Sequence, residues 1–248
     1  MRTANPALNS KTFTNMSRIT DPSRMMTIQG TVNKTALMLF LLLIPAAWTW
    51  NMFFSTESSS AVMPWMLGGF IGGFVVAIIT VFKKEWSPVT APLYSVLEGL
   101  ALGGLSAIFE ARFPGIVIQA VALTFGTLFC LLTAYRSGLI KVTENFKLGV
   151  VSATGGIALI YFASIILRLF GINMPFIHES GLIGIGFSVF VVIIAALNLV
   201  LDFDFIEKGS EAGAPKFMEW YAAFGLMVTL IWLYIEILRL LSKLASRR

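Results

Sequence analysis

One carboxyl group lies in the middle of an apolar stretch, where a charge is costly. Glu98 follows Tyr94 by one helical turn inside a mostly apolar run from about 89 to 110. An ionisable side chain at the centre of a bilayer costs about 2.5–3.5 kcal/mol on insertion scales, so such residues are candidates for proton or ion binding. Glu98 is therefore a candidate proton-binding group on an ion pathway. The alternative is a protonated side chain that hydrogen-bonds a neighbouring helix and serves packing only.

Three further carboxyl groups are candidates near the end of the sixth apolar stretch and the start of the seventh. Asp202 and Asp204 are two residues apart, so on a helix they point in roughly opposite directions and only one faces a given pathway. The short link to the last stretch predicts antiparallel neighbours and places Glu219 at a similar depth. Carboxyl groups that meet do not both ionise cheaply, so such a pair holds a proton and senses pH. Alternatively, these acids cap helix ends at the water interface.

The late acids are also candidate metal ligands. Ca²⁺ prefers oxygen ligands, so Asp204 and Asp202 are the candidate calcium ligands, with Ca²⁺ as a transported ion and no cofactor predicted. No Lys or Arg lies at the depth of Glu98 in any apolar stretch. We therefore expect protons or metal cations to compensate these acids. The other charged residues of this region are expected to form an i,i+3 ion pair (Glu236 with Arg239) and a solvated loop (Glu207, Lys208, Glu211 and Lys216).

The elements that must position these acids are membrane-spanning helices. Apolar residues make up 57% of the 248-residue chain and charged residues only 12%, about half the charged share of a soluble domain. A helix needs about 20 mostly apolar residues to cross a bilayer. Seven stretches qualify, which predicts an all-α integral membrane protein in contact with the lipid bilayer. They are 33–54, 61–82, 89–110, 114–135, 148–170, 181–203 and 217–243.

The distribution of Lys and Arg predicts the orientation. Twelve of the 18 lie on the side of the N-terminus and six on the other, so the N-terminus is expected in the cytoplasm. Residues 1–30 are polar and basic and predict a flexible cytoplasmic tail, followed by a transmembrane domain over 31–248. The net charge of +5 is explained by topology and attraction to anionic lipids, and nucleic acid binding is not expected.

Two motifs resemble a known family. The run from Leu97 to Gly104 (LEGLALGG), together with Leu201 to Glu207 (LDFDFIE), is similar to the transmembrane Bax inhibitor motif family, in its bacterial YccA-like branch. The ending LYIEILRLL, from Leu233 to Leu241, resembles the last helix of that family. The likeness covers about 34 to 244. It implies a seven-helix bundle with one central helix ringed by six, in the bacterial inner membrane.

The resemblance also implies an activity. It implies a pH-sensitive calcium leak controlled by two aspartates on the last two helices, which share a proton in the closed state. Asp204 matches the sixth-helix aspartate best, with Asp202 the near alternative. Thr229 occupies the approximate position of the seventh-helix partner and cannot ionise. Glu98 or Glu219 could substitute for it.

Two functions from different classes follow. The first is a pH-sensitive cation channel or transporter, most simply a calcium leak, gated by protonation of Glu98, Asp202, Asp204 and Glu219. The second is a non-transport protein that binds and restrains a membrane protease or another membrane protein. Membrane enzymes are not expected, because zinc hydrolases and intramembrane serine proteases need His at depth and the single His178 lies in a link.

Overall fold

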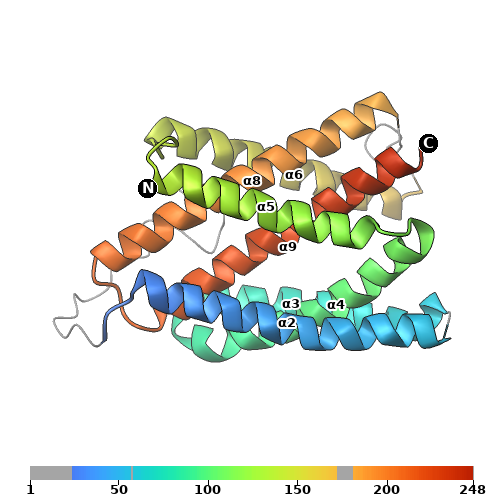
Figure 1. Cartoon of the computed structure of the whole chain (residues 1–248), viewed down its shortest axis with the longest axis horizontal. Coiled ribbons are helices and arrows are strands. Elements are labelled where there is room, and N and C mark those ends of the chain that lie inside the picture. Colours follow the sequence, from blue (N-terminus) through green and yellow to red (C-terminus); the bar gives the residue numbers. More distant parts are fainter. Residues whose placement is uncertain (1–23, 57, 172–180, 248) are drawn as a thin grey trace. The chain divides into compact units, whose positions relative to one another are not determined.

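The computed structural model describes residues 24–56, 58–171 and 181–247, and these residues are almost entirely helical. Within them, seven helices are long and apolar enough to cross a membrane (Figure 1). This confirms the all-α, seven-helix class predicted from sequence, while the ring of six helices around a seventh stays a prediction. His178 lies outside the described residues. The helices are α2 (Ile28–Thr56), α3 (Ser59–Phe82), α4 (Ser87–Arg112), α5 (Ile116–Arg136), α6 (Glu144–Leu169), α8 (Leu182–Glu211) and α9 (Met218–Ala245), with a 3-10 turn η2 (Lys84–Trp86) before α4.

Two predicted boundaries differ from the structure. The sixth helix, α8, continues to Glu211, eight residues beyond the predicted end at 203, so Lys208 is helical and not part of a loop. The prediction ends the sixth helix where its apolar residues end. The backbone hydrogen bonds of the helix continue beyond the apolar residues, because they do not depend on apolar side chains. The helix α2 begins at Ile28, and Met26 is only 1% exposed. The segment just before α2 is therefore packed, although the prediction assigned it to the tail; residues 1–23 of that tail lie outside the described residues.

The chain divides into two compact units. Unit 1 comprises Gly115–Phe203 and Thr229–Arg248, and unit 2 comprises the described chain up to Pro114 together with Asp204–Val228. The helices α8 and α9 each contribute one part to each unit.

Small residues bring the helices of unit 2 into close contact. A Cβ atom added at Gly99 or Gly103 of α4 would collide with the backbone of α2, and one added at Gly69 of α3 would collide with the backbone of α4. Apolar side chains gain little by leaving lipid for one another, so this close backbone approach supplies much of the packing. The helix α4 therefore lies against α2 on one face and against α3 on another (Figure 1).

The ends of α4 follow from its sequence. Pro88 occupies the first turn, where a missing N–H costs nothing. The helix ends at Arg112, and Gly115 adopts a positive φ of 84° that begins the turn into α5. Between these ends, α4 carries Glu98 twelve residues along a 26-residue helix, about 16 Å from its start at 1.5 Å per residue.

In unit 1, α9 runs beside α8 in the opposite direction. Lys243, near the end of α9, is 6% exposed and donates hydrogen bonds to the Gly184 carbonyl (3.0 Å) and the Ser188 hydroxyl (2.9 Å) at the start of α8. An apolar cluster of Ile157, Val191 and Ile194 joins α6 to α8. As one unbroken helix of 28 residues, α9 is long enough to span the bilayer, as predicted, without re-entering.

Candidate functional site

Glu98 is buried and hydrogen-bonded to a tyrosine. The Glu98 side chain is 7% exposed, Tyr94 is 4% exposed, and the Tyr94 hydroxyl donates to the carboxyl group one turn away on α4. From α3, Gly73 lies so close that a Cβ there would be 2.7 Å from Oε1 of Glu98. Among the described residues, no Lys or Arg forms an ion pair with Glu98. The structure places Tyr94 against Glu98, as their spacing of one helical turn predicts.

The ring of Tyr94 is fixed from α9. Phe224 meets it edge to face, with ring centroids 5.0 Å apart and planes at 81°. Phe224 also contacts Tyr221, one turn back on the same helix, at 6.4 Å. Both α9 residues are almost fully buried. The first turns of α9 therefore hold the tyrosine that hydrogen-bonds Glu98.

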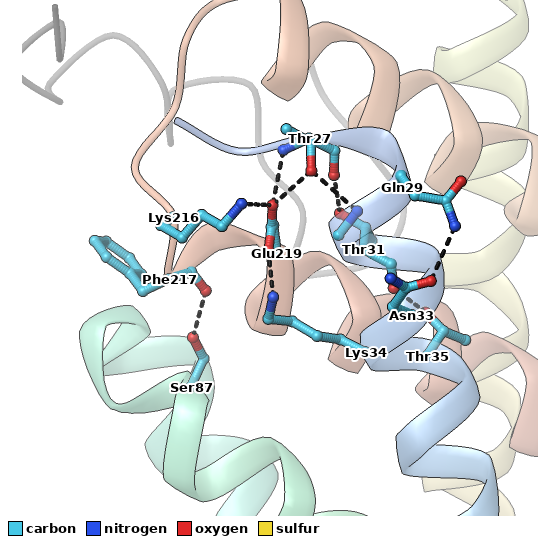
Figure 2. Close-up of polar contacts among 11 residues, drawn as sticks. Thr27, Gln29, Thr31, Asn33, Lys34, Thr35, Ser87, Lys216, Phe217 and Glu219 are labelled. Atoms are coloured by element: carbon cyan, nitrogen blue, oxygen red, sulfur yellow. Dashed lines mark hydrogen bonds and ion pairs between the residues drawn. The ribbon is translucent and has the colours of Figure 1, made fainter. Parts of the chain in front are cut away.

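Glu219, in the first turn of α9, sits among donors and cations (Figure 2). Its Oε1 accepts from the Thr27 amide (2.9 Å) and the Thr27 hydroxyl (2.8 Å), and pairs with Lys216 at 2.9 Å. Its Oε2 pairs with Lys34 of α2. Glu219 is 0% exposed, and Gly30 of α2 lies against its carboxyl group. We call Glu219, Thr27, Lys34 and Lys216 the Glu219 cluster.

The chain around this cluster is fastened by further backbone contacts. The Met26 amide donates to the Ala214 carbonyl at 2.6 Å, and Met25 and Pro215 form an isolated antiparallel bridge. On the other side, the Ser87 hydroxyl at the start of α4 donates to the Phe217 carbonyl at 3.0 Å (Figure 2). The start of α9 is therefore held by the segment before α2 and by α4.

Asp204 also has a lysine partner. Lys208 lies one turn on along α8 and pairs with Asp204 at 2.6 Å. Lysines thus compensate both Asp204 and Glu219, and the prediction that these acids lack a cationic partner is wrong. Lysine stems are long enough to carry the ammonium group from a helix end back to a buried acid, which a count of residues at one depth does not detect.

Asp202 is 1% exposed and belongs to unit 1, whereas Asp204 belongs to unit 2. Across the described ranges, no group of three or more His, Cys, Asp or Glu side chains is placed to hold a metal ion. The calcium site predicted at Asp204 and Asp202 stays a prediction.

A second buried glutamate lies in unit 1. Glu236 of α9 is 2% exposed, and Arg239 pairs with it at 2.8 Å, as the i,i+3 spacing predicts. Sequence reasoning missed the third member, Tyr161 of α6, whose hydroxyl donates to Glu236 (2.9 Å) and accepts from Arg239 (2.8 Å). A single tyrosine 75 residues from its partner gives no signal in a periodicity pattern.

A comparison with known protein families identifies the family of this chain. The family model described as Bax inhibitor 1 like matches residues 5–246. The chain belongs to the Bax inhibitor 1 like family. No curated protein and no solved structure gives a significant match.

Membership of the Bax inhibitor 1 like family agrees with the resemblance found in the LEGLALGG and LDFDFIE motifs. The LEGLALGG motif is the part of α4 that carries Glu98 and the glycines packed on α2, so it combines a buried acid with the contacts that bury it. In chemical terms, this part of the Bax inhibitor 1 like protein places a titratable carboxyl group within an apolar span. The Glu219 cluster, whose charges are already compensated, is suited to holding helices together.

Proposed function

We propose that this protein is a non-enzymatic, pH-sensitive pathway for cations, with Ca²⁺ as the first ion to test, and that protonation of Glu98 gates it. The observation that supports the proposal most is the setting of Glu98: a buried carboxyl in the middle of an apolar span, with a tyrosine hydroxyl as hydrogen-bond partner and no ion pair among the described residues. A carboxyl in such a setting changes charge by exchanging a proton, or by meeting a cation that enters the span.

The remaining acids take different parts in this proposal. Asp204 and Glu219 carry lysine partners, so a lysine compensates the charge of each carboxylate. Asp202, buried in unit 1, is a second candidate for proton or cation binding. We propose that Glu98 is the main proton-binding group and that Asp202 contributes to the pathway.

We propose further that the N-terminus lies in the cytoplasm and that the membrane is the inner membrane of a bacterium. Twelve of 18 Lys and Arg residues lie on the N-terminal side of the predicted spans, and this excess is typical of cytoplasmic loops. Protease protection of a tag at position 1 in right-side-out and inverted vesicles tests the orientation.

Flux measurements in reconstituted vesicles test the function. Purified protein in vesicles loaded with a calcium indicator is expected to pass Ca²⁺ at a rate that changes with pH across the neutral range. Glu98→Gln keeps the size and hydrogen-bonding capacity of the side chain but does not titrate, so the pH dependence is expected to disappear. Glu211→Gln, at the exposed end of α8, is the matched control and should behave like the wild type.

Equal fluxes from protein-containing and empty vesicles at every pH would refute the proposal. That result would favour the other function predicted from sequence, a protein that restrains a membrane protease or another membrane partner. A co-purified partner that is lost when residues 1–23 are deleted would then be the observation to seek.

A further inference from the structure

The first turns of α9 connect two buried carboxyl groups that do not touch. Glu219 lies in the first turn of the helix, and Phe224 follows five residues later, about 7.5 Å along the axis. Phe224 packs on Tyr94, and Tyr94 hydrogen-bonds Glu98. Any shift or rotation of these turns would therefore move the tyrosine hydroxyl relative to the Glu98 carboxyl.

The position of these turns depends on Glu219. Four groups from three segments reach its carboxylate: two from Thr27, and one each from Lys34 on α2 and Lys216 in the link before α9. The carboxylate is fully buried, and breaking a buried ion pair from one side leaves uncompensated charge. The cluster thus fixes the start of α9 against α2, while Ser87 fixes it against α4.

We propose that Glu219 is a positioning residue for Glu98: by holding the first turns of α9, it sets the contact of Phe224 with Tyr94 and so the hydrogen bond that Tyr94 gives to Glu98. The inference rests on the proposed function, since it concerns the same proton-binding group. It assigns Glu219 no contact with the ion or the proton. Its role is exerted through Phe224 and Tyr94.

Other charged or titratable groups of unit 2 also bear on the pH response of Glu98. On the elements packed against α4, these are Lys34 of α2, Lys84 and Glu85 of η2, and Glu219 and Tyr221 of α9; the helix α3 carries no charged residue. Lys84 lies over the Tyr221 ring at 5.6 Å, and Lys34 over the Trp220 ring at 5.4 Å. A direct electrostatic effect of Glu219 on Glu98 is therefore the competing explanation.

A double-mutant cycle between Glu219 and Tyr94 separates the two explanations, because these residues do not touch. The readout is the infrared carboxyl band of protonated Glu98, followed against pH in vesicles and identified by its loss in Glu98→Gln. Tyr94→Phe removes a donor to the charged carboxyl, so the midpoint of the Glu98 band is expected to move to higher pH. Glu219→Gln is expected to move the midpoint in the wild-type background and to have no further effect in Tyr94→Phe.

Equal effects of Glu219→Gln in both backgrounds would overturn the inference, because an electrostatic effect does not need the tyrosine hydroxyl. The absence of any effect in the wild-type background would overturn it as well. If Glu219→Gln does not fold, Phe224→Leu tests the same path: its effect on the midpoint must disappear in Tyr94→Phe. Glu211→Gln again serves as the control and should leave the midpoint unchanged.

The infrared measurement needs no transport, so the inference and the proposed function fail separately. If the double-mutant cycle is non-additive but the vesicles pass no cation, the positioning role of Glu219 is supported and the proposed calcium leak is refuted. If the calcium flux depends on pH but the double-mutant cycle is additive, the proposed leak is supported and the positioning role of Glu219 is refuted.

Discussion

Glu98 and Glu219 are both buried carboxyl groups of unit 2, but their surroundings differ in charge. Glu219 is surrounded by two lysines and the two donors of Thr27, whereas Glu98 has the hydroxyl of Tyr94. The first group is held in its charged form by neighbours from distant parts of the chain. The second lies in an apolar span, and among the described residues no cation is paired with it.

The difference separates two uses of a buried acid. A carboxylate with two cations joins segments, and removing it leaves the cations uncompensated. A carboxyl with one neutral donor can exchange a proton without breaking an ion pair. A glutamate at the start of α9 therefore holds segments together, whereas a glutamate in the middle of α4 is suited to gaining and losing a proton.

The largest effect is expected from removing the acid of the Glu219 cluster. Glu219→Ala leaves Lys34, only 19% exposed, without its carboxylate, and breaking a buried pair from one side costs about 3–5 kcal/mol. Lys216 is half exposed and can turn to water, so we expect about 3 kcal/mol. Thermal unfolding in detergent micelles measures the loss.

Glu98→Gln is the matched substitution at the other buried glutamate of unit 2. It keeps the shape of the side chain and strands no cation, so we expect the stability to change by less than about 1 kcal/mol. A larger loss for Glu98→Gln than for Glu219→Ala would show that the comparison is wrong.

The sequence predicts these two sites unequally. Glu98 was identifiable because it is the one charged residue between Glu85 and Glu110 and its hydrogen-bond partner, Tyr94, lies on the same helix. The Glu219 cluster was not, because Lys34 is 185 residues away in the chain and only the folded packing of α2 on α9 brings it near. Helix spans follow from local composition, whereas ion pairs between distant helices depend on tertiary contacts.

A glycine of α3 that lies against Glu98 gives the next effect. At Gly73 a Cβ would lie 2.7 Å from Oε1 of Glu98, whereas at Gly68, on the same helix, nothing lies within 4 Å. Gly73→Ala is therefore expected to cost about 1–3 kcal/mol through overpacking. Gly68→Ala should be neutral or gain up to about 1 kcal/mol from helix propensity.

Thermal unfolding of the two glycine variants side by side measures this contrast. Because the added methyl group displaces the Glu98 carboxyl, Gly73→Ala should also alter the pH dependence of calcium flux, and Gly68→Ala should not. Equal stabilities would mean that Gly73 does not confine the carboxyl group.

The smallest effect is expected from the pair of Asp204 and Lys208. The two are one turn apart on α8, and Lys208 is 30% exposed, so water solvates the lysine when the acid is removed. Pairs of this kind contribute about 0.3–0.5 kcal/mol. A double-mutant cycle of Asp204→Asn and Lys208→Gln in thermal unfolding should give a coupling in that range.

If instead Asp204→Asn changes the pH profile of flux as strongly as Glu98→Gln while stability hardly moves, Asp204 takes part in gating, and its lysine must release it during the transition. The comparison would then extend to a third kind of acid, one that is paired in the structure seen here and exchanges its partner when the pathway opens.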